Sequence, residues 1–118
     1  MADVSNTIRL GEIAHARSGD KGNHANVGVI AYSQAGFDFL KTRLTVECVE
    51  SYFASLEPKL VERFELPGIC AINFLLHEIL EGGASRSLRI DTQGKILAPA
   101  ILEMEITAPE NLAEMLPT

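Results

Sequence analysis

The segment from Asn26 to Tyr32, which reads Asn-Val-Gly-Val-Ile-Ala-Tyr, constrains the fold more than any other part of this chain. Apolar residues occupy both its odd and its even positions, a pattern typical of a central strand whose two faces are covered. Gly28 lies inside this segment, and a glycine within a strand indicates close approach of another backbone or of a ligand. We therefore predict a sheet with this strand near its centre.

Other segments supply the neighbouring strands. Residues 8–16 are predicted as a strand with a bulge at Gly11. Residues 60–66 alternate between apolar and charged side chains until Pro67 and Gly68 break the pattern. Residues 87–91 and 96–107 are predicted as a hairpin around residues 92–95, because the second segment has apolar residues at alternate positions and Pro99 suits a strand that begins at a sheet edge.

Three segments are predicted as helices. Ser33 and Thr45 are suited to cap two successive helices, which carry apolar residues at helical spacing up to Leu44 and up to Leu56 respectively. Residues 69–80 are predicted as a helix that is apolar nearly all round and therefore mostly buried, with Gly82-Gly83 ending it.

The predicted order of elements is β-β-α-α-β-α-β-β. This order favours an α+β two-layer sandwich close to the ferredoxin-like class, with a mixed or antiparallel sheet and helices on one face. A doubly wound parallel sheet fits less well because two connections resemble hairpins. With 118 residues, the chain is expected to form a single domain spanning residues 1–118.

Composition and charge exclude several classes of protein. The formal net charge is -6 and the pI is about 5.0, which argues against a nucleic-acid-binding protein. The amino terminus lacks the pattern of a signal peptide, and no apolar run approaches the length of a membrane span, so we expect a cytoplasmic protein with no membrane partner. Cys48 and Cys70 lie in apolar patterns and are expected to be free thiols.

The stretch Arg17–Asn26 is unusually rich in hydrogen-bonding groups and is predicted to be a binding loop. Gly19 and Gly22 permit backbone amides to converge, and the nearby cations suit a phosphate or a carboxylate. The expected ligand-binding residues of this loop are Arg17, Ser18, Asp20, Lys21, Gly22, Asn23 and Asn26. The alternative is a tight connection in which Asp20 pairs with Lys21 or caps amides.

Arg89 and His24 are the further candidates for a site. If residues 87–91 form a strand, Arg89 shares a face with Asp91, and it either pairs with that carboxylate or lines a pocket with the polar loop. His24 is a candidate acid or base with Asp20 as its orienting partner, although no complete catalytic set appears. The three histidines have no metal-ligand spacing, and we expect neither a metal nor a cofactor.

Two separated motifs resemble the small C-terminal domain of the AtuA-like, acyclic terpene utilisation, family. The first is residues 16–23 with residues 26–31, and the second is residues 72–76 with Gly82-Gly83 and residues 87–95. The resemblance implies a ferredoxin-like α+β domain, which in this family follows a larger N-terminal domain. It also implies a connection with the catabolism of branched or terpenoid acyl-CoA compounds.

Three functions follow as hypotheses. The chain is an accessory subunit or small-anion or acyl-CoA-binding domain that works with a larger AtuA-like protein. Alternatively, it is a self-sufficient small enzyme acting on an acyl-CoA or a carboxylate, or a non-catalytic homo-oligomeric ligand-binding module. Self-association is expected from the apolar surfaces of residues 69–80 and 96–107, and Arg89 is expected to lie close to residues 20–23.

Overall fold

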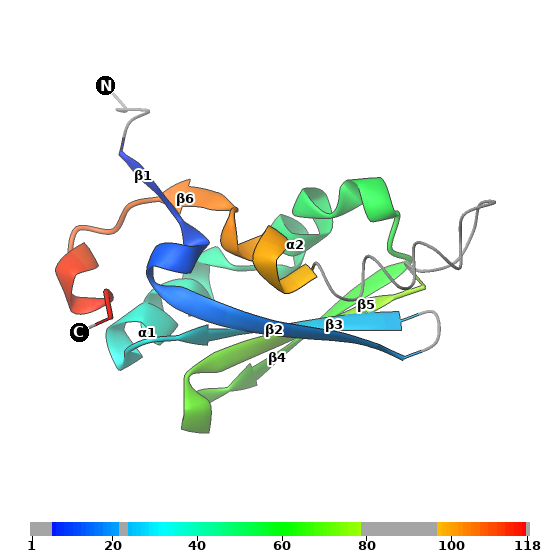
Figure 1. Ribbon diagram of the computed structural model, residues 1–118, viewed down its shortest axis with the longest axis horizontal. Coiled ribbons are helices and arrows are strands. Elements are labelled where there is room, and N and C mark those ends of the chain that lie inside the picture. The colour runs from blue at the N-terminus through cyan, green and yellow to red at the C-terminus, as the bar shows by residue number, and fades with distance from the viewer. Residues whose placement is uncertain (1–5, 22–23, 79–96, 118) are drawn as a thin grey trace.

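The protein folds into two layers. The computed structural model describes residues 6–21, 24–78 and 97–117, with the backbone alone for residues 20 and 21. A four-stranded antiparallel sheet forms one layer, and the helices cover one of its two faces (Figure 1). The predicted α+β two-layer sandwich with helices on one face is confirmed, and its sheet is antiparallel.

Two hairpins build the sheet. β2 (Ala14–Lys21) pairs with β3 (His24–Ala31), β4 (Leu60–Leu66) pairs with β5 (Ala71–His77), and β3 pairs with β5 to give the order β2-β3-β5-β4. The central position predicted for the strand of residues 26–32 is therefore confirmed. In β3 alternate residues are buried beneath the helices, namely Ala25, Val27, Val29 and Ala31.

The two predicted helix caps are present. Ser33 Oγ accepts a hydrogen bond from the Gly36 amide at 3.0 Å and precedes α1 (Gln34–Arg43). Thr45 Oγ1 accepts one from the Cys48 amide at 3.1 Å and precedes α2 (Val46–Tyr52), which is followed by the short 3-10 helix η2 (Ala54–Leu56). Each cap satisfies an amide that the first helical turn would otherwise leave unpaired. None of the described helices is long and apolar enough to cross a membrane.

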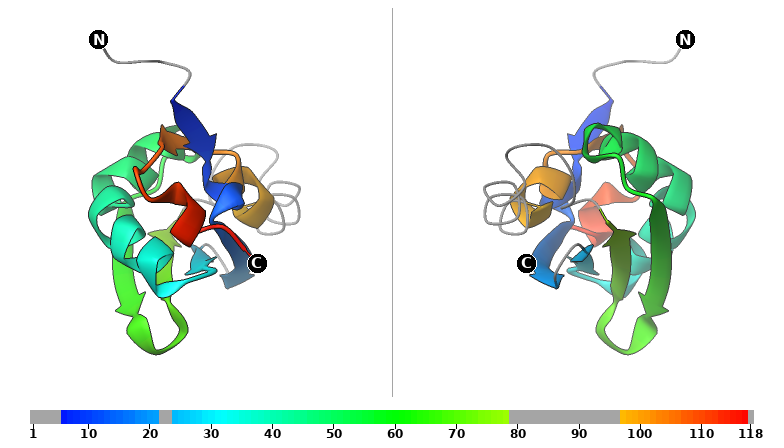
Figure 2. Two further views of the ribbon diagram at one scale, coloured as in Figure 1. Left: turned by 90° about the vertical axis from the view of Figure 1, so that its left-hand side faces the viewer. Right: turned by 90° about the vertical axis from the view of Figure 1, so that its right-hand side faces the viewer.

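The predicted strand over residues 8–16 is wrong as a continuous element. The 3-10 helix η1 (Leu10–Glu12) divides it into β1 (Thr7–Arg9) and β2. The tighter turn brings Leu10 and Ile13 into the core together, which an extended strand would place on opposite faces. β1 then leaves the main sheet and pairs with β6 (Glu105–Thr107) as a separate two-stranded ribbon (Figure 2).

The predicted helix over residues 69–80 is also wrong. Pro67–Ile69 form the 3-10 helix η3, and residues 71–77 are strand β5 between β3 and β4. The segment is apolar nearly all round because a central strand is largely covered, and a short apolar run has the same appearance in a buried helix. Its buried side chains alternate in the strand manner, and they belong to Ile72, Phe74 and Leu76.

The predicted strand over residues 96–107 is wrong except at its end. Residues 97–102 are helical, and only Glu105–Thr107 form a strand. The buried residues Leu97, Ile101 and Met104 recur at helical spacing, which competes in this sequence with an alternation of apolar residues at even positions. The other predicted strand of that hairpin, residues 87–91, lies outside the described residues.

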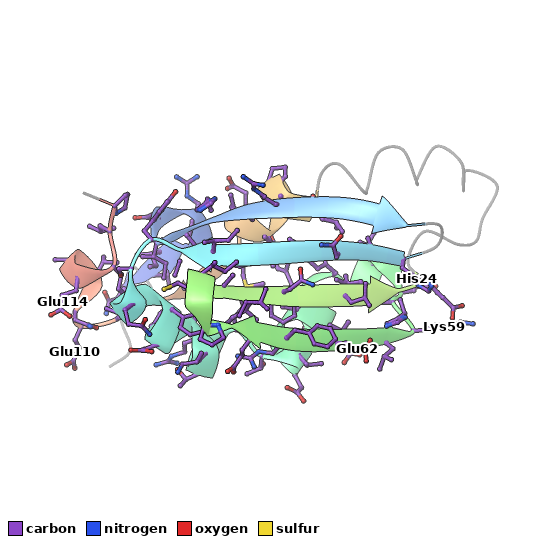
Figure 3. The ribbon with its side chains drawn as sticks, turned by 90° about the horizontal axis from the view of Figure 1, so that it is seen from below. His24, Lys59, Glu62, Glu110 and Glu114 are labelled. Carbon is purple, nitrogen blue, oxygen red and sulfur yellow. The ribbon has the colours of Figure 1, made fainter. Side chains whose placement is uncertain are left out.

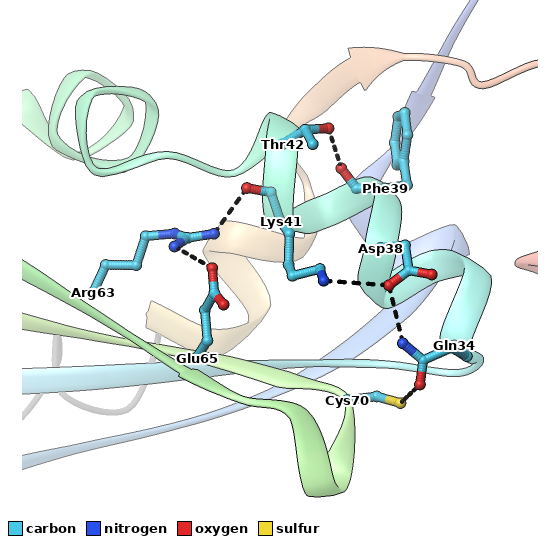
Figure 4. A network of polar contacts seen from close by, with 8 residues as sticks. All are labelled: Gln34, Asp38, Phe39, Lys41, Thr42, Arg63, Glu65 and Cys70. Atoms are coloured by element: carbon cyan, nitrogen blue, oxygen red, sulfur yellow. Dashed lines mark hydrogen bonds and ion pairs between the residues drawn. The ribbon is translucent and has the colours of Figure 1, made fainter.

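Arg63 fastens the helical layer to the edge of the sheet. Its Nε group donates to the Leu44 carbonyl at 3.0 Å, just after α1. Its NH2 group donates to the Lys41 carbonyl at 2.9 Å, in the last turn of α1 (Figure 4). Its NH1 group donates to Glu65 Oε2 at 2.8 Å. A planar guanidinium can satisfy several acceptors at once, and a cation is favourable at a helix C-terminus. The apolar core lies between the two layers and includes Leu10, Ile13, Phe37, Leu40, Leu44, Ile72, Phe74, Leu97 and Ile101.

Candidate functional site

The face of the four-stranded sheet opposite the helices, called the outer face below, carries the candidate site. Within the described part of the chain no element covers this face (Figure 3). Because strand residues alternate between faces, it presents every second residue, starting from His15 in β2, His24 in β3, Leu60 in β4 and Ala71 in β5. The outer face thus mixes polar side chains with exposed apolar ones.

The polar stretch Arg17–Asn26 is a strand hairpin and does not form the predicted loop. Residues up to Lys21 belong to β2, and residues from His24 belong to β3. Their backbones form an antiparallel ladder, with Arg17 opposite Gly28 and Gly19 opposite Asn26. The expected nest of converging amides is therefore wrong for the described residues, because ladder geometry turns successive amides to opposite edges of the strand.

The hairpin divides the predicted ligand-binding residues between two faces. Arg17 is exposed on the outer face, together with half-buried Asn26. Ser18 belongs to the opposite face, where its Oγ accepts a hydrogen bond from the Ala98 amide at 3.1 Å. Ser18 thus helps to hold the helical residues 97–102 against β2, and it does not share a surface with Arg17.

The remaining predicted residues are placed only in part. The register sets Lys21, and not Asp20, opposite His24, and the side chains of Asp20 and Lys21 are not described. Gly22, Asn23 and Arg89 lie outside the described residues, and so does the expected proximity of Arg89 to residues 20–23. Arg17, Asn26 and His24 are the predicted site residues that the structure brings together on one face.

An open hollow of about 380 Å³ lies on the outer face. Its lining comes from the central strands β3 and β5, and it consists of His24, Ala25, Asn26, Asn73 and Leu75. Asn26 Nδ2 donates to Asn73 Oδ1 at 3.4 Å, so that two half-buried amides stand side by side in the hollow. Asn73 lies in strand β5 and not in the helix predicted over residues 69–80, which is why it reaches this face of the sheet.

His24 and His77 stand at one end of this hollow. Their ring centroids are 5.0 Å apart with an interplanar angle of 70°. His24 Nδ1 accepts the Glu78 amide at 3.2 Å, which places the proton of its neutral ring on Nε2. His77 Nε2 lies 2.8 Å from Glu62 Oε1, and because an ionised carboxylate only accepts, the ring donates there. Each ring thus has one nitrogen whose role is fixed by a neighbour.

Glu78 links His24 to Lys59, the residue before the edge strand β4. Its backbone adopts a left-handed conformation, with φ of 61°, directly after β5. Its amide bonds to His24, and its carboxylate pairs with Lys59 at 3.2 Å. A non-glycine residue in this conformation persists only where surrounding contacts hold it, and these two contacts do so. No group of three or more potential ligands in the described ranges is arranged to hold a metal ion.

Sequence reasoning missed Asn73, His77 and Glu62 as members of the site. Asn73 and His77 stand two positions to either side of Leu75 in β5, and Glu62 stands opposite Leu75 in β4. The alternation of residues 71–77 was the signal that would have put Asn73 and His77 on one face. Glu62 joins them only through strand pairing, which no local pattern reveals.

The fold and the site together define a small α+β domain of the ferredoxin-like class, one sheet face of which is covered by none of the described elements. The chain belongs to the AtuA ferredoxin-like domain family, whose model matches residues 8–107. This match spans nearly all of the described elements, and the resemblance drawn from the two sequence motifs is confirmed. No curated protein and no solved structure matches the chain significantly.

Proposed function

We propose that this chain is an accessory subunit that works with a larger AtuA-like protein and presents its outer face to that partner. In this role it binds a small anion or acyl compound during the catabolism of branched or terpenoid acyl-CoA compounds. The chain belongs to the AtuA ferredoxin-like domain family. The choice of partner follows from the resemblance to the AtuA-like family, which implies a larger N-terminal domain before this one.

An apolar strip on the outer face is the observation that carries the proposal. It consists of Leu60, Phe64 and Leu66 along β4, with Glu62 between the first two, together with Ile69 in η3 just beyond the strand. The exposed fractions of these four apolar residues are 51%, 46%, 43% and 61%. Large apolar side chains that are exposed together at one edge of a sheet are typical of a protein-binding surface. The strip lies beside the hollow, so a partner seated on it would also cover the bound compound.

The anion-binding part of the proposal rests on Arg17. Its side chain is exposed on the outer face, and no ion pair within the described part of the chain involves it. A guanidinium recognises a carboxylate or a phosphate through two parallel hydrogen bonds. The acidic character of the whole chain favours a small anion over an extended polyanion.

Complex formation tests the accessory role. We expect the purified chain to co-elute with the larger AtuA-like protein of the same organism in size-exclusion chromatography. Phe64→Glu places a charge in the apolar strip and should weaken the complex about tenfold or more. Leu116→Glu is the matched control, because Leu116 is also exposed, at 38%, but follows η4 (Leu112–Glu114) outside the sheet. Equal binding by both variants, or no complex with the wild-type chain, would contradict the proposal.

A homo-oligomer is the second candidate, and the same apolar strip favours it. Two copies related by a twofold axis could bury their strips against each other. Light scattering on the isolated chain separates the two candidates. A dimer that Phe64→Glu converts to a monomer supports self-association. A wild-type monomer argues against self-association and favours binding of the larger protein to the apolar strip.

A further inference from the structure

The two amides in the hollow form a donor and acceptor pair. Their mutual hydrogen bond, Asn26 Nδ2 to Asn73 Oδ1, occupies one donor and one acceptor. Among the described residues, one end of the pair keeps an unused carbonyl oxygen and the other keeps an unused NH2 group, whichever way the two amides are flipped. The contact is long, at 3.4 Å, so the pair can open toward a ligand at small cost.

Two glycines keep the space beside these amides open. A Cβ atom at Gly28 would stand 3.4 Å from Asn73 Oδ1, and one at Gly19 would stand 3.4 Å from Asn26 Oδ1. A side chain at either position would therefore touch one of the two amides. Leu75 adds an apolar wall, and His24 adds a ring whose Nε2 is a donor. The hollow therefore offers hydrogen-bonding groups of both kinds beside an apolar surface.

Arg17 lies in the same row across the strands as Gly28 and Asn73. Adjacent strands are about 4.8 Å apart, so the backbones of Arg17 and Asn73 are separated by about 10 Å. An extended arginine side chain is long enough to span most of that distance, and Gly28, which lies between the two residues, has no side chain to obstruct it. A ligand with an amide over the asparagine pair would thus have a negative group within reach of the guanidinium.

We propose that the hollow binds a secondary amide that carries a neighbouring carboxylate, as in an N-acyl amino acid. The amide N–H and C=O meet the unused carbonyl and NH2 groups of Asn26 and Asn73, and the carboxylate meets Arg17. This inference deepens the anion-binding part of the proposed function, on which it rests, and it does not require the larger partner.

A titration of the isolated chain tests the inference, with N-acetylglycine as the probe and acetate as the anion without an amide. Two-dimensional NMR follows the side-chain NH2 signals of both asparagines and the backbone signals of β3 and β5. N-acetylglycine should shift these signals with a Kd of about 1 mM, which is reasonable for so small a ligand, and acetate should bind about tenfold more weakly.

Three variants separate the contributions. Asn73→Leu keeps the branched shape but removes the amide, and it should weaken N-acetylglycine binding about tenfold while leaving acetate binding unchanged. Arg17→Gln should weaken both ligands. Asn111→Ser, in the exposed C-terminal segment, is the control and should change neither.

The possible results have distinct meanings. Shifts of both asparagine NH2 signals in the wild-type chain, together with an Asn26 NH2 shift that needs about tenfold more N-acetylglycine in Asn73→Leu, would establish the amide site. Equal affinities for N-acetylglycine and acetate, unaffected by Asn73→Leu, would overturn the inference and leave a simple anion site as first proposed. An absence of any shift in β3 and β5 would overturn both the amide site and the anion-binding role, whereas a failure to bind the larger protein would affect neither reading of this titration.

Discussion

Replacing Arg63 should loosen the contact between α1 and the edge of the sheet. The side chain is only 19% exposed, and its donors reach two carbonyls at the end of α1. Arg63→Met keeps much of the aliphatic packing but removes both of these hydrogen bonds and the ion pair with Glu65. A hydrogen bond from a charged donor contributes about 1.5–3 kcal/mol when buried, and partial access of water lowers this value. We therefore expect the free energy of unfolding to fall by about 2–3 kcal/mol.

Thermal and urea denaturation followed by circular dichroism measures this loss. For a domain of this size each kcal/mol corresponds to roughly 4 °C, so the melting temperature should fall by about 8–12 °C. Arg63→Lys keeps the charge but not the planar fork, and it should lose about half as much. Arg43→Met is the control, because Arg43 is exposed over the Phe39 ring at 5.5 Å and should contribute below about 1 kcal/mol. If the Met variants at positions 63 and 43 are equally stable, the fastening role of Arg63 is refuted.

Three further predictions concern single residues outside the hollow. Cys70 is left-handed, with φ of 55°, so Cys70→Gly should be neutral or stabilising in urea denaturation, whereas Cys70→Val should lose about 1–3 kcal/mol. Burial raises the pKa of Cys48, so in a Cys70→Ser background this thiol should react with iodoacetamide more slowly than a free cysteine does at pH 8; an equal rate would contradict the burial. Burial and the nearby Glu103 raise the pKa of Tyr52, whose hydroxyl donates to the Ala100 carbonyl at 2.6 Å. Because this pKa is higher in the folded protein, its contribution is complete below about pH 10 and is lost as pH rises further, so Tyr52→Phe should flatten the alkaline decrease in stability.

The sequence was sufficient to predict those helices and strands whose signals lie within a single segment. The capping residues Ser33 and Thr45 and the helical spacing after them identified α1 and α2. The central strand was recognised from residues that are apolar on both faces. β5 was missed because its apolar run is equally compatible with a buried helix, and only its four-residue connection to β4 over residues 67–70 marked it as half of a hairpin.

The residues of the candidate site were predictable where they lie within one continuous segment of the sequence. Polarity alone picked out Arg17, Asn26 and His24 within the first hairpin. Alternation between faces then separated Ser18 from them, which required the knowledge that this stretch is a strand and not a loop. Asn73 and His77 reach the site through the pairing of β3 with β5, and such long-range register is set by the packing of the whole sheet.

The β1–β6 ribbon has a consequence for how the chain folds. The two hairpins of the main sheet join residues close in sequence, so each can form early at a small cost in loop-closure entropy. The ribbon pairs Ile8 with Ile106 and therefore has to wait until nearly the whole chain has been ordered. We therefore expect the ribbon to be the last part of the domain to form. On a ribosome the four-stranded sheet would be complete before residue 106 emerged, and the amino-terminal strand would remain unpaired until the last part of the chain arrived.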